Sequence, residues 1–310
     1  MTRNSLLAAC AATLLFAAPA IAKPVKVGVT LSRFEHLFLV KVHDAIQQQA
    51  RAMGDVEVQF EDAQGDVGRQ MSQVQNFIAQ GVDAIIVNAA DTSATRGMTK
   101  MVTQAGIPLV YVNLGPSLDE KLPPKVAVVV SDHVVSGRLE MEGLAKCMHD
   151  KGSIAIMLGE LASNATQERT AGNKAVIASH PAIKVVQEQS ANYQRNQAID
   201  LMSNWITNGE KIDAVAANND EMAIGAIYAM QQAGISPKNV CIGGIDATPD
   251  ALAEMKKGNL AVTVFQDATG QGKGAVEAAV KLARGELVEP FVLIPYELVT
   301  PENMQSYMNR

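Results

Sequence analysis

Strand-like and helix-like segments alternate along the chain after residue 22, and this alternation limits the fold more than any other feature. Short runs of Val, Ile and Ala are each followed by an amphipathic stretch, with a brief polar connection between them. Such repetition is typical of parallel sheets with right-handed helical crossovers. The aromatic content of only 4% suits Val/Ile-rich strands covered by Ala-rich helices. We expect strands at 25–29, 56–60, 84–87, 109–112, 126–130, 154–158, 183–188, 214–217, 240–243 and 262–265. We expect helices through 40–50, at 66–80 and 95–105, from about 165, and at 194–208, 222–233 and 251–257.

The strand–helix pattern restarts halfway along the chain. Residues 81–88 resemble residues 211–218, because each segment leaves a helix, passes an Asp, runs through an apolar strand and ends in an Asn. This similarity indicates an α/β protein with two doubly wound parallel-sheet lobes whose strand ends face one cleft. The alternative is that any two βα units look alike.

The first 22 residues have the organisation of a secretory signal peptide. Arg3 provides a positive charge, residues 6–18 are apolar, and 20–22 (Ala-Ile-Ala) form a small-x-small cleavage site. We expect cleavage after Ala22 and a periplasmic location. The apolar run is too short to cross a membrane. A lipid-attachment site at Cys10 is the alternative, but almost no hydrophobic region precedes it.

Charge and cysteine usage exclude several classes of protein. A formal net charge of −6 without a basic cluster argues against a nucleic-acid partner. Cys147 and Cys241 remain after cleavage, and an oxidising compartment would permit a bridge between them. We expect two separate buried thiols instead, because one lies in a predicted helix and the other begins a predicted strand. Metal-ligand spacings and phosphate-binding loops are missing from the sequence, so we expect no metal and no cofactor.

Polar and aromatic residues gather immediately after the predicted strands. Because ligands of open α/β sheets bind outside the carboxyl ends of the strands, these residues are candidates for a binding site. Asn and Gln both donate and accept hydrogen bonds, Asp and Arg make stronger charge-assisted ones, and aromatic side chains pack on the C–H faces of a ring. The pattern therefore predicts a site for a hydroxylated ring, with Phe34 or Phe38 on one side and Tyr193 on the other. The candidate ligand-binding residues are Ser32, Phe34, Glu35, His36, Phe38, Asn88, Asn113, Arg169, Tyr193, Asn219, Asp246 and Gln266.

Other polar residues near strand ends have a simpler structural explanation. We interpret Asp83, Asp213 and Asp220 as helix caps or turn residues. Neither His36 nor His133 has a partner in a nucleophile motif such as G-x-S-x-G, so hydrolase chemistry has little support and an enzyme is not expected.

Two motifs carry a resemblance to a known family. Residues 217–226 (ANNDEMAIGA) and 243–250 (GGIDATPD) resemble the second-lobe signature of periplasmic sugar-binding proteins of the ribose/galactose type. Residues 75–88 and 111–113 resemble more closely the branch that binds inositols and the amino-inositols called rhizopines.

This resemblance implies a solute-binding protein that closes on its ligand and delivers it to an ABC permease with its ATPase. It further implies a three-segment hinge near Ser131, Gln266 and Pro295, with an N-terminal lobe of 23–130 plus 267–295 and a C-terminal lobe of 131–266 plus 296–310. All of the candidate residues above except Phe34 and Glu35 fall on its contact positions. We expect a monomer, and a chemoreceptor is left open as a further partner.

Departures from the ribose-type pattern bear on the ligand. The chain has Asn113-Leu114 where those proteins usually have Asp-Arg, and Phe38-Leu39 where they have an aromatic pair. Losing an arginine while keeping Glu35, Asp91 and Asp246 makes the site less cationic. We therefore expect a neutral or amine-bearing cyclitol rather than an acidic sugar, with a pentose or hexose as the alternative. A remoter alternative, the effector-binding core of a lac-repressor-type regulator, would need a helix-turn-helix where this chain has a leader.

Overall fold

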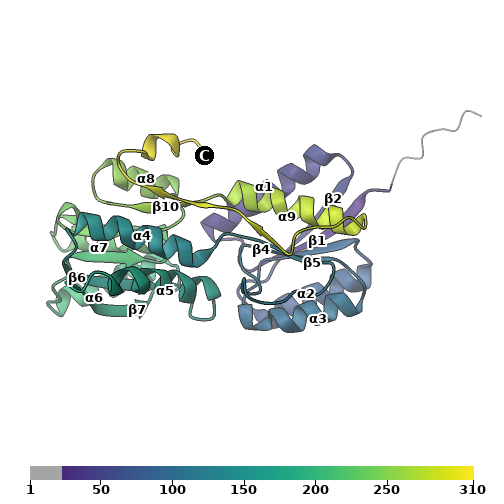
Figure 1. Ribbon diagram of the computed structural model, residues 1–310, viewed down its shortest axis with the longest axis horizontal. Coiled ribbons are helices and arrows are strands. Elements are labelled where there is room, and N and C mark those ends of the chain that lie inside the picture. Colours follow the sequence, from purple (N-terminus) through teal and green to yellow (C-terminus); the bar gives the residue numbers. More distant parts are fainter. Residues whose placement is uncertain (1–22) are drawn as a thin grey trace, which may run out of the picture.

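The computed structural model describes residues 23–310, and these form two lobes that lie side by side (Figure 1). The signal peptide, its cleavage after Ala22 and the lipid-attachment alternative at Cys10 fall on residues 1–22, outside the described residues. Among residues 23–310, no helix is both long enough and apolar enough to cross a membrane.

The N-terminal lobe is built on a parallel sheet with the strand order β11-β5-β4-β3-β1-β2. Helices α1 and α9 cover one face of this sheet, and α2 and α3 cover the other (Figure 1). The elements are β1 (Val25–Leu31), α1 (Leu37–Met53), β2 (Val56–Asp62), α2 (Val67–Gln80), β3 (Ala84–Val87), η1 (Thr92–Ala94), α3 (Thr95–Gln104), β4 (Leu109–Val112), β5 (Val126–Val130), α9 (Ala268–Ala283) and β11 (Phe291–Leu293).

The C-terminal lobe has a parallel sheet in the order β7-β6-β8-β9, extended by the antiparallel pair β10-β12. Helices α4 and α5 cover one face, and α6 and α7 the other (Figure 1). The elements are α4 (His133–Cys147), β6 (Gly152–Leu158), α5 (Asn164–Ala178), β7 (Ile183–Ser190), α6 (Arg195–Thr207), β8 (Ala214–Ala217), α7 (Asp220–Gln232), η2 (Pro237–Asn239), β9 (Cys241–Gly243), α8 (Pro249–Lys256), β10 (Thr263–Gln266), β12 (Tyr296–Val299) and η3 (Met304–Ser306).

Local sequence explains how α2 forms and packs beneath the first strand. The Asp66 carboxylate caps the helix by accepting a hydrogen bond from the Arg69 N–H at 2.8 Å, and Gly81 ends it in the left-handed conformation. Phe77 of α2 packs so closely on Gly28 of β1 that a Cβ there would lie 2.5 Å from its ring. The first helix–sheet contact therefore requires glycine at this position of the strand.

The two lobes follow the same plan, as the repeated segments 81–88 and 211–218 predicted. Strands β2-β1-β3-β4 lie in the same order as β7-β6-β8-β9. Asp83 accepts a hydrogen bond from the Lys26 N–H at 2.8 Å, and Asp213 accepts one from the Ser153 N–H at the same distance. Both aspartates thus fasten the start of a central strand, a structural role in keeping with their interpretation from the sequence.

The chain passes between the lobes in three places (Figure 1). The first passage leads from β5 to α4, the second from β10 to α9, and the third from β11 to β12. Helix α9, which the alternation pattern did not predict as an element, packs beside α1 on the N-terminal sheet. The two lobes are therefore joined by three separate connections.

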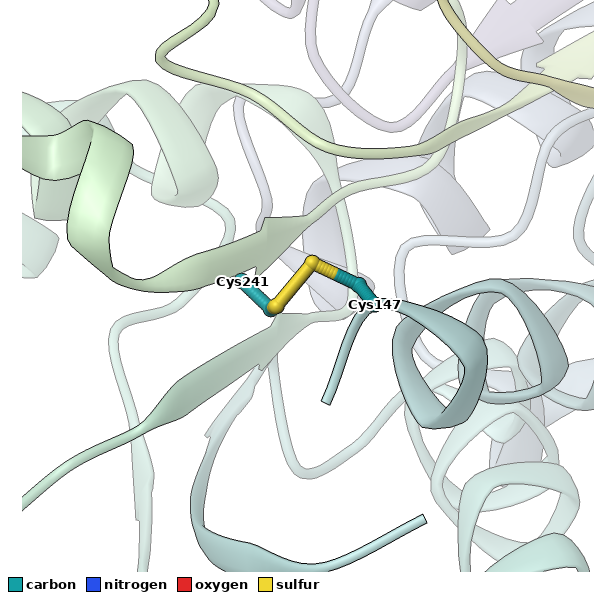
Figure 2. The surroundings of a disulfide bond; sticks show 2 residues. All are labelled: Cys147 and Cys241. Carbon is teal, nitrogen blue, oxygen red and sulfur yellow. A yellow bond between two sulfur atoms is a disulfide. The ribbon is translucent and has the colours of Figure 1, made fainter. Parts of the chain in front are cut away.

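The expectation of two separate thiols is wrong, because Cys147 and Cys241 form a disulfide bond with a Cα–Cα distance of 5.9 Å (Figure 2). Their elements were predicted correctly, since Cys147 ends α4 and Cys241 begins β9. Strand β9 lies under the end of α4, so the two side chains meet although 94 positions separate them in the sequence. The bridge links the helix that follows the first passage to the strand that leads to Asp246.

Candidate functional site

A cavity of about 530 Å³, including the part that opens to solvent, lies between the two lobes. Pockets of this size suit small organic ligands. Its walls come from both lobes and from the ends of the passages between them. The lining residues are Ser32, Arg33, His36, Phe38, Leu39, Asn113, Leu114, His133, Glu160, Ser163, Ala165, Arg169, Tyr193, Asn219, Asp246 and Gln266.

Arg169 is the buried cation of this cavity. It projects from α5 and is 4% exposed. Its guanidinium donates to the Asn218 carbonyl, to Gln266 Oε1 at 3.0 Å and to the Tyr296 hydroxyl at 3.1 Å. These bonds to three separate segments of the chain fix the orientation of the side chain, while its Nε has no partner.

Asp246 is the buried acid opposite it. A carboxylate oxygen lies 4.0 Å from Arg169 Nη2, beyond hydrogen-bonding distance. Burial raises the pKa of Asp246 to about 8, and the neighbouring Arg169 opposes that rise. A ligand that donates hydrogen bonds or carries a positive charge would stabilise the ionised carboxylate.

Strained backbone positions bring side chains to the cavity. Asp246, Asn113 and Tyr193 all have positive φ angles, of 125°, 64° and 60°. Such conformations are unfavourable for residues other than glycine, and they tend to cluster at ligand sites. At Asp246 the backbone is held by a hydrogen bond from its N–H to the Val264 carbonyl at 2.8 Å.

Apart from Arg33, which lies near Glu160 at the mouth of the cleft, the N-terminal lobe contributes uncharged polar groups. The Ser32 hydroxyl donates to Asn88 Oδ1 at 2.7 Å, and the Asn88 amide donates to the Val112 carbonyl and to Asn113 Oδ1 at 3.1 and 3.3 Å. Asn88 is fully buried behind the cavity wall. It orders Ser32 and Asn113 rather than lining the cavity itself.

Aromatic rings from both lobes meet at the cavity. His36 lies edge-on to Tyr193 with the ring centroids 6.1 Å apart. The Tyr193 ring packs against Gly159, where a Cβ would overlap it, and its hydroxyl shares a hydrogen bond with Thr166 at 2.7 Å. Burial and, to a smaller extent, the charge of Arg169 lower the pKa of His36 to about 4, so His36 is neutral at pH 7. Phe38 lines the cavity from α1.

Several polar atoms at the cavity are buried without a hydrogen-bond partner. They are His36 Nδ1, Ser163 Oγ, Arg169 Nε and Gln266 Nε2. An unsatisfied buried donor or acceptor costs about 1–3 kcal/mol, so buried polar groups are normally paired. Four of them around one cavity provide the donors and acceptors that a hydroxylated molecule could satisfy.

Direct contacts join the lobes at the mouth of the cleft. Arg33 Nε lies 3.4 Å from Glu160 Oε1, and the Thr92 hydroxyl donates to the Ala162 carbonyl at 3.2 Å. The Asn164 amide donates to the Gly115 carbonyl at 3.4 Å. The lobes are therefore in contact on the solvent side of the cavity, as in a closed arrangement.

The structure brings most of the predicted residues together, but three of them do not line the cavity. Phe34 is exposed and packs on His43, with centroids 5.6 Å apart. Glu35 lies on an outer groove, 3.7 Å from Arg33, and Asn88 lies behind Ser32. Asn219 does line the cavity, but its side chain also caps α7 and donates to the Tyr193 carbonyl.

The sequence pattern did not single out every residue of the cavity wall. Ser163 and Ala165 begin α5 beyond the strand end, and Leu39 and Leu114 were considered only as departures from a family pattern. His133 was noted near the cleft without a role. Asp220 is fully buried and accepts from Thr263 Oγ1 and the Thr248 N–H, both at 2.7 Å, which supports its structural interpretation. Among residues 23–310, no cluster of three or more His, Cys, Asp or Glu could hold a metal ion.

Comparisons with known proteins agree on one family. Residues 27–287 match the family described as "Periplasmic binding protein domain". A Rhizobium meliloti protein named for rhizopine binding is 48% identical over 92% of this chain and 93% of its own length. The ribose import binding protein of Bacillus subtilis is 31% identical over 90% of this chain and 88% of its own length.

Solved structures extend the similarity to the arrangement of the lobes. An ABC transporter solute-binding protein from Bacillus halodurans with bound myo-inositol has a TM-score of 0.86 and 45% identity, covering 93% of this chain and 98% of that one. A Caulobacter myo-inositol-binding protein bound to myo-inositol has a TM-score of 0.86 and 28% identity, with coverages of 92% and 97%. The predicted fold of two parallel-sheet lobes is confirmed by this similarity.

Proposed function

Because the chain belongs to the periplasmic binding protein family, whose members bind small ligands and work with ABC transporter permeases, we propose that it is the exported solute-binding component of such a transporter. The family consists of substrate-binding proteins, and we propose no catalytic step here. Export would follow cleavage after Ala22. The chain would bind its ligand as a monomer and present the closed lobes to a permease and its ATPase.

We propose a polyhydroxylated ring of the inositol class, neutral or amine-bearing, as the ligand. The observation that carries this proposal is the set of unpartnered buried polar atoms around Arg169 and Asp246. An axial or equatorial hydroxyl both donates and accepts, so one ring can satisfy the Asp246 carboxylate and the Arg169 guanidinium together. A few charge-assisted bonds of about 1.5–3 kcal/mol each supply the roughly −8 kcal/mol that micromolar binding needs.

The relatives support this choice of ring. The Bacillus halodurans and Caulobacter structures hold myo-inositol, and the Rhizobium meliloti protein is named for a rhizopine. No described side chain donates a hydrogen bond to the Asp246 carboxylate, and Arg169 Nη2 stays 4.0 Å away, so the ionised form of Asp246 would accept from a ligand hydroxyl or pair with an amine. A uronic acid would place a second carboxylate beside it and should bind more weakly.

We propose that the ligand touches both lobes and that closure depends on these contacts. The contact residues would be Ser32, His36, Phe38, Asn113, Arg169, Tyr193, Asn219, Asp246 and Gln266, with Asn88 supporting them. The lobe boundaries would fall at 130/131, 266/267 and 295/296. Bonds made from both sides favour the closed form because they exist only there.

A ligand panel tests the proposal. Titration calorimetry should give micromolar or tighter binding of myo-inositol or an amino-inositol, with weaker binding of ribose, galactose and a uronic acid. A ligand at 1,000 times its Kd should stabilise the protein by about 4 kcal/mol, which a thermal-shift assay would detect. Tighter binding of the uronic acid than of any cyclitol would contradict the proposed ligand class.

An Asp246→Ala variant tests the site itself. We expect at least a hundredfold weaker binding, because the main acceptor for ligand donors is lost, with little change in the melting temperature of the ligand-free protein. Asp200→Asn on the exposed surface of α6 is the matched control and should bind like the wild type. A collapse of ligand-free stability in Asp246→Ala would identify Asp246 as a structural residue instead.

A further inference from the structure

A chain of buried hydrogen bonds leads from Arg169 away from the cavity. Arg169 Nη2 donates to the Tyr296 hydroxyl at 3.1 Å, and that hydroxyl lies 2.8 Å from His133 Nδ1. His133 Nε2 in turn lies 3.2 Å from the Asn113 carbonyl oxygen. All four residues are less than 9% exposed, so water does not compete for these bonds.

The two ends of this chain, together with a neutral His133, determine the direction of every bond in it. Arginine only donates and a carbonyl oxygen only accepts. The Tyr296 oxygen therefore accepts from Arg169, and His133 Nε2 carries the proton that it donates to Asn113. A neutral imidazole has no second proton, so His133 Nδ1 accepts the hydrogen of the Tyr296 hydroxyl.

The chain of bonds lies where the polypeptide passes between the lobes. His133 is the first residue of α4 after the first passage, and Tyr296 is the first residue of β12 after the third. Gln266, the other acceptor of Arg169 Nη2, ends β10 just before the second passage. Asn113 belongs to the opposite lobe, and its amide side chain is tied to Asn88.

We infer that His133 and Tyr296 are positioning residues that hold Arg169 in its ligand-binding orientation and make that orientation depend on the hinge. Both ring nitrogens of His133 are engaged by the protein, so the imidazole has no hydrogen-bonding capacity left for a ligand although it borders the cavity. The Tyr296 hydroxyl is likewise engaged on both sides. Neither residue was among the contacts predicted from the sequence.

The electrostatic surroundings favour the same protonation state. Burial and, to a smaller extent, the charge of Arg169 lower the pKa of His133 to about 3. A protonated imidazole would donate from both nitrogens, and Tyr296 would then face two donors, His133 and Arg169. The neutral ring keeps the sequence of donors and acceptors intact.

Tyr296→Phe is the direct test, since it removes one hydroxyl and keeps the ring. This test rests on the proposed function, so myo-inositol is the probe and wild-type binding is measured first. We expect the variant to bind myo-inositol at least tenfold more weakly, because Arg169 Nη2 and His133 Nδ1 both lose a buried partner. Tyr307→Phe is the matched control, because that hydroxyl donates to Glu297 at 2.7 Å in the same lobe without touching Arg169.

The tautomer of His133 gives a second measurement. The proposed chain of bonds requires the proton on Nε2, whereas a role in packing alone would require neither tautomer. Nitrogen-15 NMR of histidine-labelled protein, with and without myo-inositol, should show a neutral His133 ring protonated on Nε2. Protonation on Nδ1, or an unchanged Kd for Tyr296→Phe, would overturn the inference. A wild-type protein that fails to bind any cyclitol would instead contradict the proposed function, and the tautomer would still report on the bond chain.

Discussion

The two lobes share a strand order but differ in what they bury. Every buried residue of the N-terminal sheet and its connections that carries polar atoms is neutral, as in the network of Thr30, Gln70, Gln73 and Asn88. The described C-terminal half buries Arg169, Asp246, Glu140, Asp220 and Glu254, and it alone contains the disulfide. Similar scaffolds therefore carry different chemistry to the same cleft.

This difference in buried charge indicates that the two lobes contribute unequally to ligand binding. Buried charges give the stronger hydrogen bonds, but they need a rigid surrounding that satisfies them. In the C-terminal lobe, Glu140 of α4 accepts from Asn173 and from the Ala217 N–H, at 2.9 and 3.0 Å, just before the strand end that receives Arg169. We expect this lobe to supply most of the binding free energy and the N-terminal lobe to complete the cavity when it closes.

The largest expected effect of this difference is on stability. Replacing both cysteines in a Cys147→Ser/Cys241→Ser variant should lower the free energy of unfolding of the C-terminal lobe by about 4 kcal/mol, since a loop of 94 positions is no longer closed in the unfolded chain. Differential scanning calorimetry should resolve earlier unfolding of that lobe alone. Wild-type protein treated with a reductant is the control and should behave in the same way. If the unfolding temperature of the C-terminal lobe is unchanged in this variant, the disulfide does not distinguish the stabilities of the two lobes.

A smaller effect is expected on the neutral side of the cleft. Ser32→Ala should weaken myo-inositol binding about tenfold, or roughly 1.4 kcal/mol, because one neutral hydroxyl is lost. That is less than the loss expected for Asp246→Ala. Titration calorimetry of the two variants under the same conditions gives the ratio of their dissociation constants for myo-inositol. If Ser32→Ala binds as weakly as Asp246→Ala, the charged lobe does not dominate binding.

The sequence predicts the strands well because their composition is local information. The expected bounds 84–87, 109–112, 126–130 and 214–217 coincide with β3, β4, β5 and β8. Contacts between residues that are distant in the sequence were harder to predict. Residues 147 and 241 were assigned to the right elements, yet their contact depends on how α4 packs over β9, which no local pattern reveals.

Side-chain direction limited the prediction of the site. Phe34 and Phe38 both follow the first strand, but Phe38 lies within α1 and points inward, whereas Phe34 lies in the preceding loop and packs on His43. His133 and Tyr296 were missed as functional residues because they follow interlobe passages rather than the carboxyl ends of central strands. The rule that ligands bind outside the carboxyl ends of parallel strands predicts residues that border the cleft. It does not predict the residues that orient them.

The smallest effect concerns acids that face each other across the lobes. Burial, together with the charges of Asp132 and of Asp119 in the opposite lobe, raises the pKa of Glu168 on α5 to about 7. A pKa above the ordinary 4.5 means that the closed form takes up a proton, so closure is favoured as pH falls and this advantage is lost as pH rises through 7. Because Glu168 is partly exposed, we expect screening to keep the effect to about two- or threefold in Kd.

Glu168→Gln should therefore bind myo-inositol about two- to threefold more tightly than the wild type at pH 8, and the difference should shrink toward pH 5. With Asp200→Asn as the control, a ratio that stays constant across this pH range would show that Glu168 does not sense the opposite lobe.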